Sequence, residues 1–229
     1  MANDQREVRL QKLEALKAAG IRPYADRYPT THTLDAARTE AETTEGTKVR
    51  VAGRVMTARA FGQLTFVHLQ DASGRCQVAL DASVVGADAL ARFDKLVDLG
   101  DFVGLEGTTW KTKKGEPTVR ATSWTFLAKA LRPLPEKWHG LSDRETCYRE
   151  RHLDLLVNPE TRARFKLRSR LVRELRAYLD RHGFEEVETP VLAAKATGAL
   201  ARPFLTHHNA LNLQCALRIA PETWLKKCV

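Results

Sequence analysis

After residue 48 the chain carries five short segments in which apolar and polar residues alternate. These segments are rich in Val, Thr and aromatic residues, and turns containing Gly and Asp separate them. They read VRVAGRVM, LTFVHLQD, RCQVAL, DFVGLEGTTWKT and PTVRATSWTFLA. Between the third and fourth, Leu90, Phe93 and Leu96 are spaced as one face of a helix. Three strands, a helix and two strands is the order of an OB barrel, which we expect over residues 48–130; a meander with a surface helix is the alternative.

The N-terminal residues 1–47 predict a helix followed by a connector. Val8, Leu10, Leu13 and Leu16 recur at mostly helical spacing before Gly20, which indicates a short amphipathic helix over residues 5–19. Residues 23–45 are polar and weakly patterned. We expect a connector there with about one helical turn.

A second region begins after the segment LRPLPEKWHGL, residues 131–141, whose two closely spaced prolines indicate a stiff linker. We therefore expect a separate domain over residues 142–229. Asn158, Pro159 and Glu160 form a typical helix start. The helix should run to His182 over about 23 residues, or roughly 35 Å. Its apolar stripe consists of Leu167, Leu171, Leu175 and Leu179.

The acidic stretch GFEEVETPVL follows this helix. Three carboxylates at Glu185, Glu186 and Glu188 are a candidate site for a hard cation. They alternate faces in an extended run that Pro190 ends, so they cannot converge on one ion. We expect a short strand with a packing role and no metal ligands in this chain.

The charge balance favours a polyanion as partner. The 229 residues include 37 Lys and Arg against 28 Asp and Glu, a net charge of +9, which makes nucleic acid the leading partner class and a merely solvated basic surface the alternative. The four cysteines lack disulfide-framework and zinc-ligand spacing, which is typical of reduced thiols in the cytosol. The sequence has neither a signal-peptide pattern nor an apolar run of about 18 residues, so we expect neither secretion nor membrane insertion.

Three side chains of the predicted barrel fit single-stranded nucleic acid. Strand alternation places Phe66 and His68 on one face, and it puts Gln77 on the corresponding face of the next strand. We expect these residues to share an exposed surface on which Phe66 stacks on a base, Gln77 reads a base edge and Arg59 contacts a phosphate or base. Burial in the barrel core is the alternative for Phe66. His68 carries no predicted role. Lys111, in the hairpin segment KTKKGEP, contacts phosphate or is simply solvated.

The second region resembles a known family. RSRLVRELRAYLDRHGFEEVETPVL is similar to motif 1 of class II aminoacyl-tRNA synthetases, in which this helix and strand form a dimer interface; Leu171, Leu175 and Pro190 would lie there. LRPLPEKWHGL, ARPFLTHHNALNL and LRIAPETWLKK resemble the lysyl-tRNA synthetase family over essentially the whole chain, whereas aspartyl and asparaginyl relatives differ in the LRIAPE segment. The resemblance implies an α+β fold: an OB barrel followed by the start of an antiparallel α/β catalytic domain.

The resemblance also implies site residues. The family's anticodon contacts fall on Arg59, Phe66 and Gln77, the same trio that alternation brings together. Its lysine-pocket contacts fall on Gly198 and on Glu222, whose carboxylate would pair with an ammonium group of lysine. An ordinary first-turn helix acid is the alternative for Glu222. Two glycines are usual in the family where this chain has Thr197 and Gly198.

By resemblance, the activity is ATP-dependent attachment of L-lysine to tRNA(Lys), with Mg²⁺, in a cytoplasmic homodimer. Motif 2, with its FRNE segment, and motif 3 hold ATP in the family, and neither occurs in these 229 residues. We therefore expect the residues that bind ATP and Mg²⁺ to be absent from this chain. A truncated, non-catalytic protein that binds tRNA or dimerises is the competing interpretation.

Overall fold

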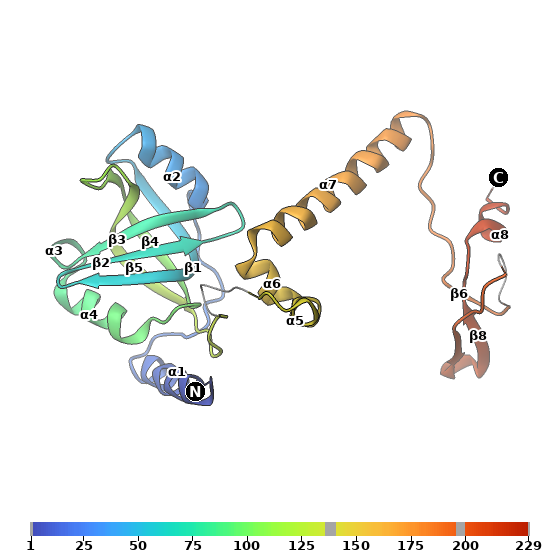
Figure 1. The fold of residues 1–229 in the computed structure, drawn as a ribbon, viewed down its shortest axis with the longest axis horizontal. Coiled ribbons are helices and arrows are strands. Elements are labelled where there is room, and N and C mark those ends of the chain that lie inside the picture. Colours follow the sequence, from blue (N-terminus) through green and yellow to red (C-terminus); the bar gives the residue numbers. More distant parts are fainter. Residues whose placement is uncertain (1, 136–140, 196–199, 229) are drawn as a thin grey trace. The chain divides into compact units, whose positions relative to one another are not determined.

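The alternating segments form five strands that close into a barrel, as the computed structural model of the protein shows (Figure 1). The structure describes residues 2–135, 141–195 and 200–228, and the chain divides into two units, residues 1–157 and 158–229. The strands of the first unit are β1 (Lys48–Phe61), β2 (Leu64–Gln70), β3 (Arg75–Asp81), β4 (Phe102–Lys111) and β5 (Pro117–Ala128).

The order of the strands around the barrel is β1-β2-β3-β5-β4. All neighbouring pairs are antiparallel except β3 and β5, which pair in parallel. A meander would have paired β3 with β4, so this connection excludes the alternative and confirms the predicted OB fold.

The core of the barrel consists of the inward-facing halves of the strands. Val51, Val67, Val78 and Leu105 are fully buried there. Two helices, α3 (Ala82–Val85) and α4 (Ala87–Leu96), lie between β3 and β4 in the sequence. Phe93 of α4 enters the same core, as the helical spacing of its segment predicts.

The connector of residues 23–45 contains a full helix, α2 (Leu34–Thr43), so the prediction of about one turn was wrong. Thr33 caps the helix by accepting a hydrogen bond from Ala36 N at 3.3 Å, and Asp71 Oδ2 accepts one from Leu34 N at 2.9 Å. The buried side of α2 is Leu34, Ala37 and Ala41. Two of these three contacts are alanines, and this is why the apolar pattern is weak in the sequence.

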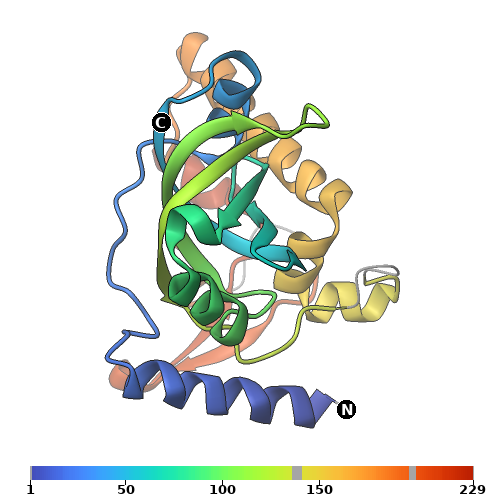
Figure 2. The same ribbon diagram turned by 90° about the vertical axis from the view of Figure 1, so that its left-hand side faces the viewer.

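Helix α1 (Ala2–Ala18) lies at the opposite end of the barrel from α2 (Figures 1 and 2). Leu13 and Leu16 are buried, in agreement with the predicted amphipathic helix. Arg9 Nη1 donates to the carbonyl oxygen of Ala130 at 2.8 Å, and Lys12 Nζ donates to Asp98 Oδ1 at 2.6 Å. Two charged residues of α1 therefore fasten it to the barrel.

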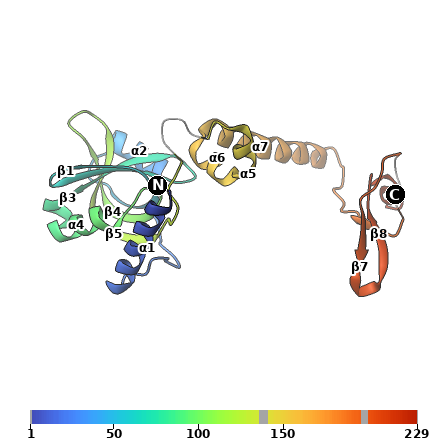
Figure 3. The same ribbon diagram turned by 60° about the horizontal axis from the view of Figure 1, so that its bottom comes forward.

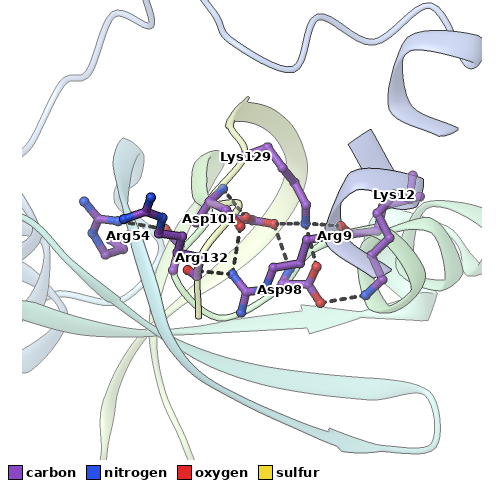
Figure 4. A network of polar contacts seen from close by, with 10 residues as sticks. Arg9, Lys12, Arg54, Asp98, Asp101, Lys129 and Arg132 are labelled. Carbon is purple, nitrogen blue, oxygen red and sulfur yellow. Dashed lines mark hydrogen bonds and ion pairs between the residues drawn. The ribbon is translucent and has the colours of Figure 1, made fainter. Parts of the chain in front are cut away.

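A buried ion cluster lies behind these contacts (Figure 4). Lys129 Nζ donates to Asp98 Oδ2 and to Asp101 Oδ2, both at 2.6 Å, and to the carbonyl oxygen of Leu96 at 3.0 Å. The side chains of Lys129 and Asp101 are fully buried. Asp101 also accepts backbone hydrogen bonds from Asp98 N and Ala130 N at 2.8 and 2.7 Å. The buried charges of Lys129 and Asp101 thus partner each other, as burial requires.

The first unit ends with α5 (Arg144–Arg149) and α6 (Arg151–Val157). Residues 131–135 of the predicted linker have no helix or strand, and residues 136–140 lie outside the described residues. The division between the two units falls after Val157, whereas the sequence places the domain boundary within residues 131–141.

The second unit begins with α7 (Pro159–Arg181), which has the predicted length of 23 residues. It continues with β6 (Leu192–Ala193), β7 (Leu205–His208), the 3-10 helix η1 (Asn209–Leu211), β8 (Leu213–Leu217) and α8 (Glu222–Leu225). The three strands form an antiparallel sheet in the order β6-β8-β7. Figure 3 shows β7 and β8 as its hairpin.

The predicted strand over Glu185 and Glu188 is not formed. Residues 184–190 have no regular structure, and β6 begins at Leu192, beyond Pro190. A strand needs a neighbour for its backbone groups, and no described segment pairs with this one. Glu186 instead forms an ion pair with Arg176 of α7 at 3.0 Å.

Among the described residues, no helix is long and apolar enough to cross a membrane. The same residues contain no cluster of three or more His, Cys, Asp or Glu side chains suited to a metal ion.

Candidate nucleic-acid interface

A bulge in β1 is the first feature that shapes the candidate interface. The pairing of β1 with β2 shifts register between Val55 and Thr57, and such a bulge changes which face the following residues occupy. Val51 and Val55 face the core before it. After it, Arg59 lies directly opposite Phe66, and residues opposite one another in an antiparallel pair share a face. The bulge thus brings Arg59 onto the face that carries Phe66.

Two rows of side chains cross the outside of strands β1, β2, β3 and β5. We call them together the outer face. The first row is Arg59, Phe66, Ala79 and Arg120, and the second is Thr57, His68, Gln77 and Thr118. All three predicted anticodon contacts therefore lie on one face of the barrel.

Phe66 is half-buried, and its ring makes an edge-to-face contact with Phe61. The ring centroids are 6.2 Å apart, and the ring planes differ by 71°. Phe66 lies outside the cluster of buried residues that forms the barrel core. Its ring is therefore on the surface side of the sheet, where a base can stack on it.

Arg59 is exposed beside Phe66. Among the described residues, its guanidinium has no hydrogen-bond or ion-pair partner. An unpaired guanidinium presents all of its donors to an incoming phosphate or base edge. Arg59 is thus a cation available to nucleic acid.

Gln77 lies on the outer face, but its side chain is only 8% exposed. The predicted exposure is therefore wrong for Gln77, and its neighbour in the first row, Ala79, is fully buried. Gln77 is covered because neighbouring polar groups hold its amide. With its oxygen 2.9 Å from Thr118 Oγ1, the amide nitrogen donates to both carboxylate oxygens of Glu116 at 3.1 Å.

Glu116 and His68 extend this polar group. His68 Nδ1 lies 2.9 Å from Thr57 Oγ1, and His68 Nε2 lies 3.4 Å from Glu116 Oε1. Glu116 therefore lies between His68 and Gln77 and is itself exposed. A carboxylate has about four acceptor positions, so Glu116 can accept a further hydrogen bond from a base N–H group.

Glu116 was not among the predicted site residues, although it belongs to the KTKKGEP segment. The cationic residues of that segment drew attention to phosphate, whereas the following acid is the residue that reaches the outer face. Its signal is the turn itself: Thr112 N donates to Glu116 O, and Glu116 N donates to Thr112 Oγ1, which closes the hairpin at Glu116. Lys111, Lys113 and Lys114 are exposed around this turn.

Arg120 closes the first row on the far side of Phe66. It donates to Asp81 Oδ2 at 2.9 Å and lies over the ring of Trp110 at 5.9 Å. Hydrogen bonds from Ser83, followed by the one from Arg120, hold the pKa of the Asp81 carboxyl below its ordinary value. Arg120 is thus a positioned cation, in contrast to the unpaired Arg59.

Glu222 is the first residue of α8, in the second unit. Its carboxylate is exposed and forms an ion pair with Lys226 at 2.8 Å, one helical turn away. Gly198, the other predicted lysine contact, lies outside the described residues. The described residues therefore show Glu222 as an accessible carboxylate at a helix start.

The apolar stripe of α7 is open to solvent. Leu171 is 66% exposed and Leu175 is 57% exposed, and Pro190 is exposed as well. Beside the stripe lies a groove of about 590 Å³. Val172, Leu175, Leu179 and Phe184 are among the residues that line it.

Two family models match consecutive parts of the chain. Residues 49–127 match the family described as OB-fold nucleic acid binding domain, and residues 143–229 match tRNA synthetases class II (D, K and N). The barrel is thus an OB-fold domain, and the residues after it match the start of a class II synthetase domain.

The individual relatives that the chain resembles are lysine–tRNA ligases. The chain is 49% identical to the lysine–tRNA ligase of Carboxydothermus hydrogenoformans over 98% of its own length and 46% of that protein. It is 46% identical to the lysine–tRNA ligase of Pelotomaculum thermopropionicum, over 98% of its own length and 44% of that protein. It is 47% identical to the lysine–tRNA ligase of Moorella thermoacetica, over 98% of its own length and 46% of that protein. The chain is a homologue of lysine–tRNA ligases and corresponds to their N-terminal portion. It spans about half the length of these relatives.

Proposed function

We propose that the outer face binds the anticodon of lysine tRNA. The observation that carries the proposal is the direct pairing of Arg59 with Phe66, which sets an unpaired guanidinium beside a half-exposed aromatic ring. OB folds bind single strands on this region of the barrel, through stacking and phosphate contacts.

The roles of the residues follow from their contacts. Phe66 stacks on one base, and Arg59 contacts the phosphate or edge of that nucleotide. Gln77 is held by Thr118 and Glu116, so it contributes a fixed amide that needs no ordering when RNA binds. Glu116 accepts from a base N–H group, and this function suits a carboxylate already positioned by its neighbours.

The experiment is RNA binding by a Phe66→Ala variant. Loss of one stacked base costs about 1–3 kcal/mol of binding free energy. Because the ring lies outside the core, the circular dichroism spectrum should stay unchanged. A stem-loop RNA with the lysine anticodon is titrated by fluorescence anisotropy, with an unrelated anticodon as control. Equal affinity of variant and parent would remove Phe66 from the site.

We further propose that the chain acts as the N-terminal part of a lysine–tRNA ligase, which attaches L-lysine to its tRNA with ATP and Mg²⁺ in the cytoplasm. Glu222 would bind an ammonium group of the lysine substrate, and the backbone of Gly198 would approach that substrate. The described residues do not fit an ATP–Mg²⁺ group: the Glu222 carboxylate is ion-paired with Lys226, and no cluster of metal ligands is present among them. No step through ATP is therefore assigned to this chain.

A second copy of the chain is the proposed partner of α7. Leu171, Leu175 and Pro190 are exposed, and they match the dimer interface of class II synthetases in the resemblance stated above. A helix with an uncovered apolar stripe gains free energy by burying it.

A further inference from the structure

We infer that Phe61 forms a second stacking platform on the outer face, which takes the base next to the one on Phe66. The inference rests on the proposed function of the outer face as an anticodon site. It adds a residue and a second nucleotide to that site.

Phe61 reaches this place because β1 continues past the bulge to the hairpin tip. It pairs with Leu64 across a two-residue turn at Gly62 and Gln63, and the positive φ of +64° at Gly62 permits that turn. Arg59 lies two residues before Phe61 on the same strand. Side chains two apart on a strand share a face, so Phe61 belongs to the same side of the sheet as Arg59 and Phe66.

The Phe61 ring is available to a ligand. It is 63% exposed, although it already touches Phe66. Single exposed apolar residues are ordinary, but here two aromatic rings and the half-exposed Leu64 are contiguous. The unpaired guanidinium of Arg59 borders them.

The geometry of the two rings decides what they can hold. Their planes differ by 71° and their centroids are 6.2 Å apart, so the rings cannot sandwich one flat base between them. Each ring can instead receive a base of its own. Two neighbouring nucleotides that are unstacked from each other fit this arrangement, as single-stranded loops do when proteins splay out their bases.

The occupant is nucleic acid rather than a protein segment because of the charge around it. Arg59 is unpaired among the described residues, and the chain carries a net charge of +9. A nucleotide satisfies both features, since its base covers the ring and its phosphate meets the cation. An apolar protein segment would cover Phe61 and leave Arg59 without a partner.

The test is a set of double-mutant cycles between protein and RNA. The full chain and its variants Phe61→Ala, Phe61→Leu and Phe66→Ala are titrated with the anticodon stem-loop. The same stem-loop is also used with one loop nucleotide at a time made abasic. Tyr24→Ala is the matched control, because Tyr24 is an exposed aromatic residue that bridges to Ala128 at the other end of β5.

We expect Phe61→Ala to weaken binding of the intact RNA by about 5- to 150-fold. Phe61→Leu should weaken it nearly as much, because Leu keeps apolar bulk but offers no ring. The Phe61→Ala effect should vanish on one abasic RNA, and that nucleotide should be adjacent to the one at which the Phe66→Ala effect vanishes. When the effects of a protein substitution and of an abasic nucleotide on the binding free energy do not add, the side chain and the base contact each other.

Three results would overturn the inference while leaving the proposed function intact, provided that Phe66→Ala binds weakly. The first is that Phe61→Ala binds the RNA as tightly as the parent, and the second is that Phe61→Leu does so. The third is that the effects of Phe61→Ala and Phe66→Ala vanish at the same nucleotide. If Phe66→Ala also binds as the parent does, the proposed anticodon site itself is wrong. If circular dichroism shows that Phe61→Ala is unfolded, the RNA affinity of Phe61→Leu is compared with that of the parent instead.

Discussion

At the scale of single residues, the outer face combines two kinds of side chain. Arg59 is free to move, whereas Gln77 is held in place by Thr118 and Glu116. A free cation costs ordering entropy when it binds but can follow the RNA backbone. A fixed amide costs little ordering entropy, and in the proposed site it would discriminate between bases. If the outer face binds the anticodon as proposed, affinity comes mainly from Arg59 and selectivity from Gln77.

Lys129 gives a prediction about stability. Replacing it with Met keeps its length but leaves the fully buried Asp101 without its cation. Removing one partner of a buried ion pair typically costs about 3–5 kcal/mol. We expect Lys129→Met to lower the free energy of unfolding of the first unit by about this amount in urea denaturation.

Lys12→Met is the matched control for this prediction, since Lys12 contacts the same cluster from its partly exposed side. It should cost about 1 kcal/mol or less, as surface pairs do. A Lys129→Met variant as stable as the parent would show that the cluster contributes nothing net.

Asp98 gives a prediction about pH. Burial by itself would raise the pKa of this carboxyl, but hydrogen bonds from Lys12 and Lys129 outweigh it and hold the pKa below its ordinary value. A lowered folded-state pKa stabilises the protein above the unfolded value of about 3.9, and this contribution is lost as pH falls through the folded value.

We therefore expect the first unit to lose stability below about pH 4. Asp98→Asn should be less stable than the parent at neutral pH and should show a shallower loss in acid. The measurement is urea unfolding by tryptophan fluorescence at a series of pH values. If the free energy of unfolding falls equally with pH in the parent and in Asp98→Asn, the lowered pKa of Asp98 does not contribute to stability.

At the scale of elements, the sequence predicted the helices and strands that a local pattern marks. It did not predict the elements whose formation depends on partners distant in the sequence. The five strands and α7 were predicted because strong alternation and evenly spaced leucines mark them. Helix α2 was underestimated because its buried contacts are mostly alanines and because one cap, Asp71, is distant in the sequence. The strand expected at Glu185 did not form, because a strand requires a neighbour that no local pattern supplies.

The candidate site shows the same division. Alternation alone placed Phe66 and Gln77 on one face. It could not show that Gln77 is covered, because the covering groups come from β5 through the parallel pairing of Gln77 with Thr118. Arg59 reaches the same face through the bulge between Val55 and Thr57, which the alternation pattern does not reveal.

Helix α7 gives a prediction about assembly. If its apolar stripe packs on a second copy, the chain should self-associate at tens of micromolar, on the order of concentrations where weak contacts appear. Leu171→Asp combined with Leu175→Asp should shift the population to monomer, because two charges would then be buried at the contact.

Sedimentation equilibrium checks this prediction. Arg173→Ala is the control, since residue 173 points away from the side of the helix that carries Leu171 and Leu175. A parent protein that stays monomeric over the whole concentration range would remove α7 as a self-association surface.

At the scale of the whole molecule, the two units give a prediction about activity. Adenylate formation requires cationic groups placed against the reacting phosphate, and motifs 2 and 3, which bind ATP in the family, do not occur in these 229 residues. We expect this chain by itself to bind lysine tRNA with an affinity that falls steeply as salt rises. It should not exchange pyrophosphate into ATP in the presence of lysine.

The measurement is lysine-dependent ATP–pyrophosphate exchange beside a Glu222→Gln variant. Glu222 is exposed at the start of α8, so the substitution should leave the fold unchanged. Exchange by the parent that disappears in Glu222→Gln would show that these residues assemble an ATP site after all.

The hydrogen bond that holds α1 on the barrel affects when the first unit can fold during translation. Arg9 donates to the carbonyl oxygen of a residue 121 positions later in the chain. At 5–20 residues per second, a ribosome needs about 6 to 24 s to add that stretch. During this time α1 is without its acceptor, and the barrel cannot close, because β5 is still being synthesised. The first unit therefore acquires its final packing late in translation. A pause in elongation before Ala130 would lengthen the exposure of Leu13 and Leu16 to chaperones and proteases.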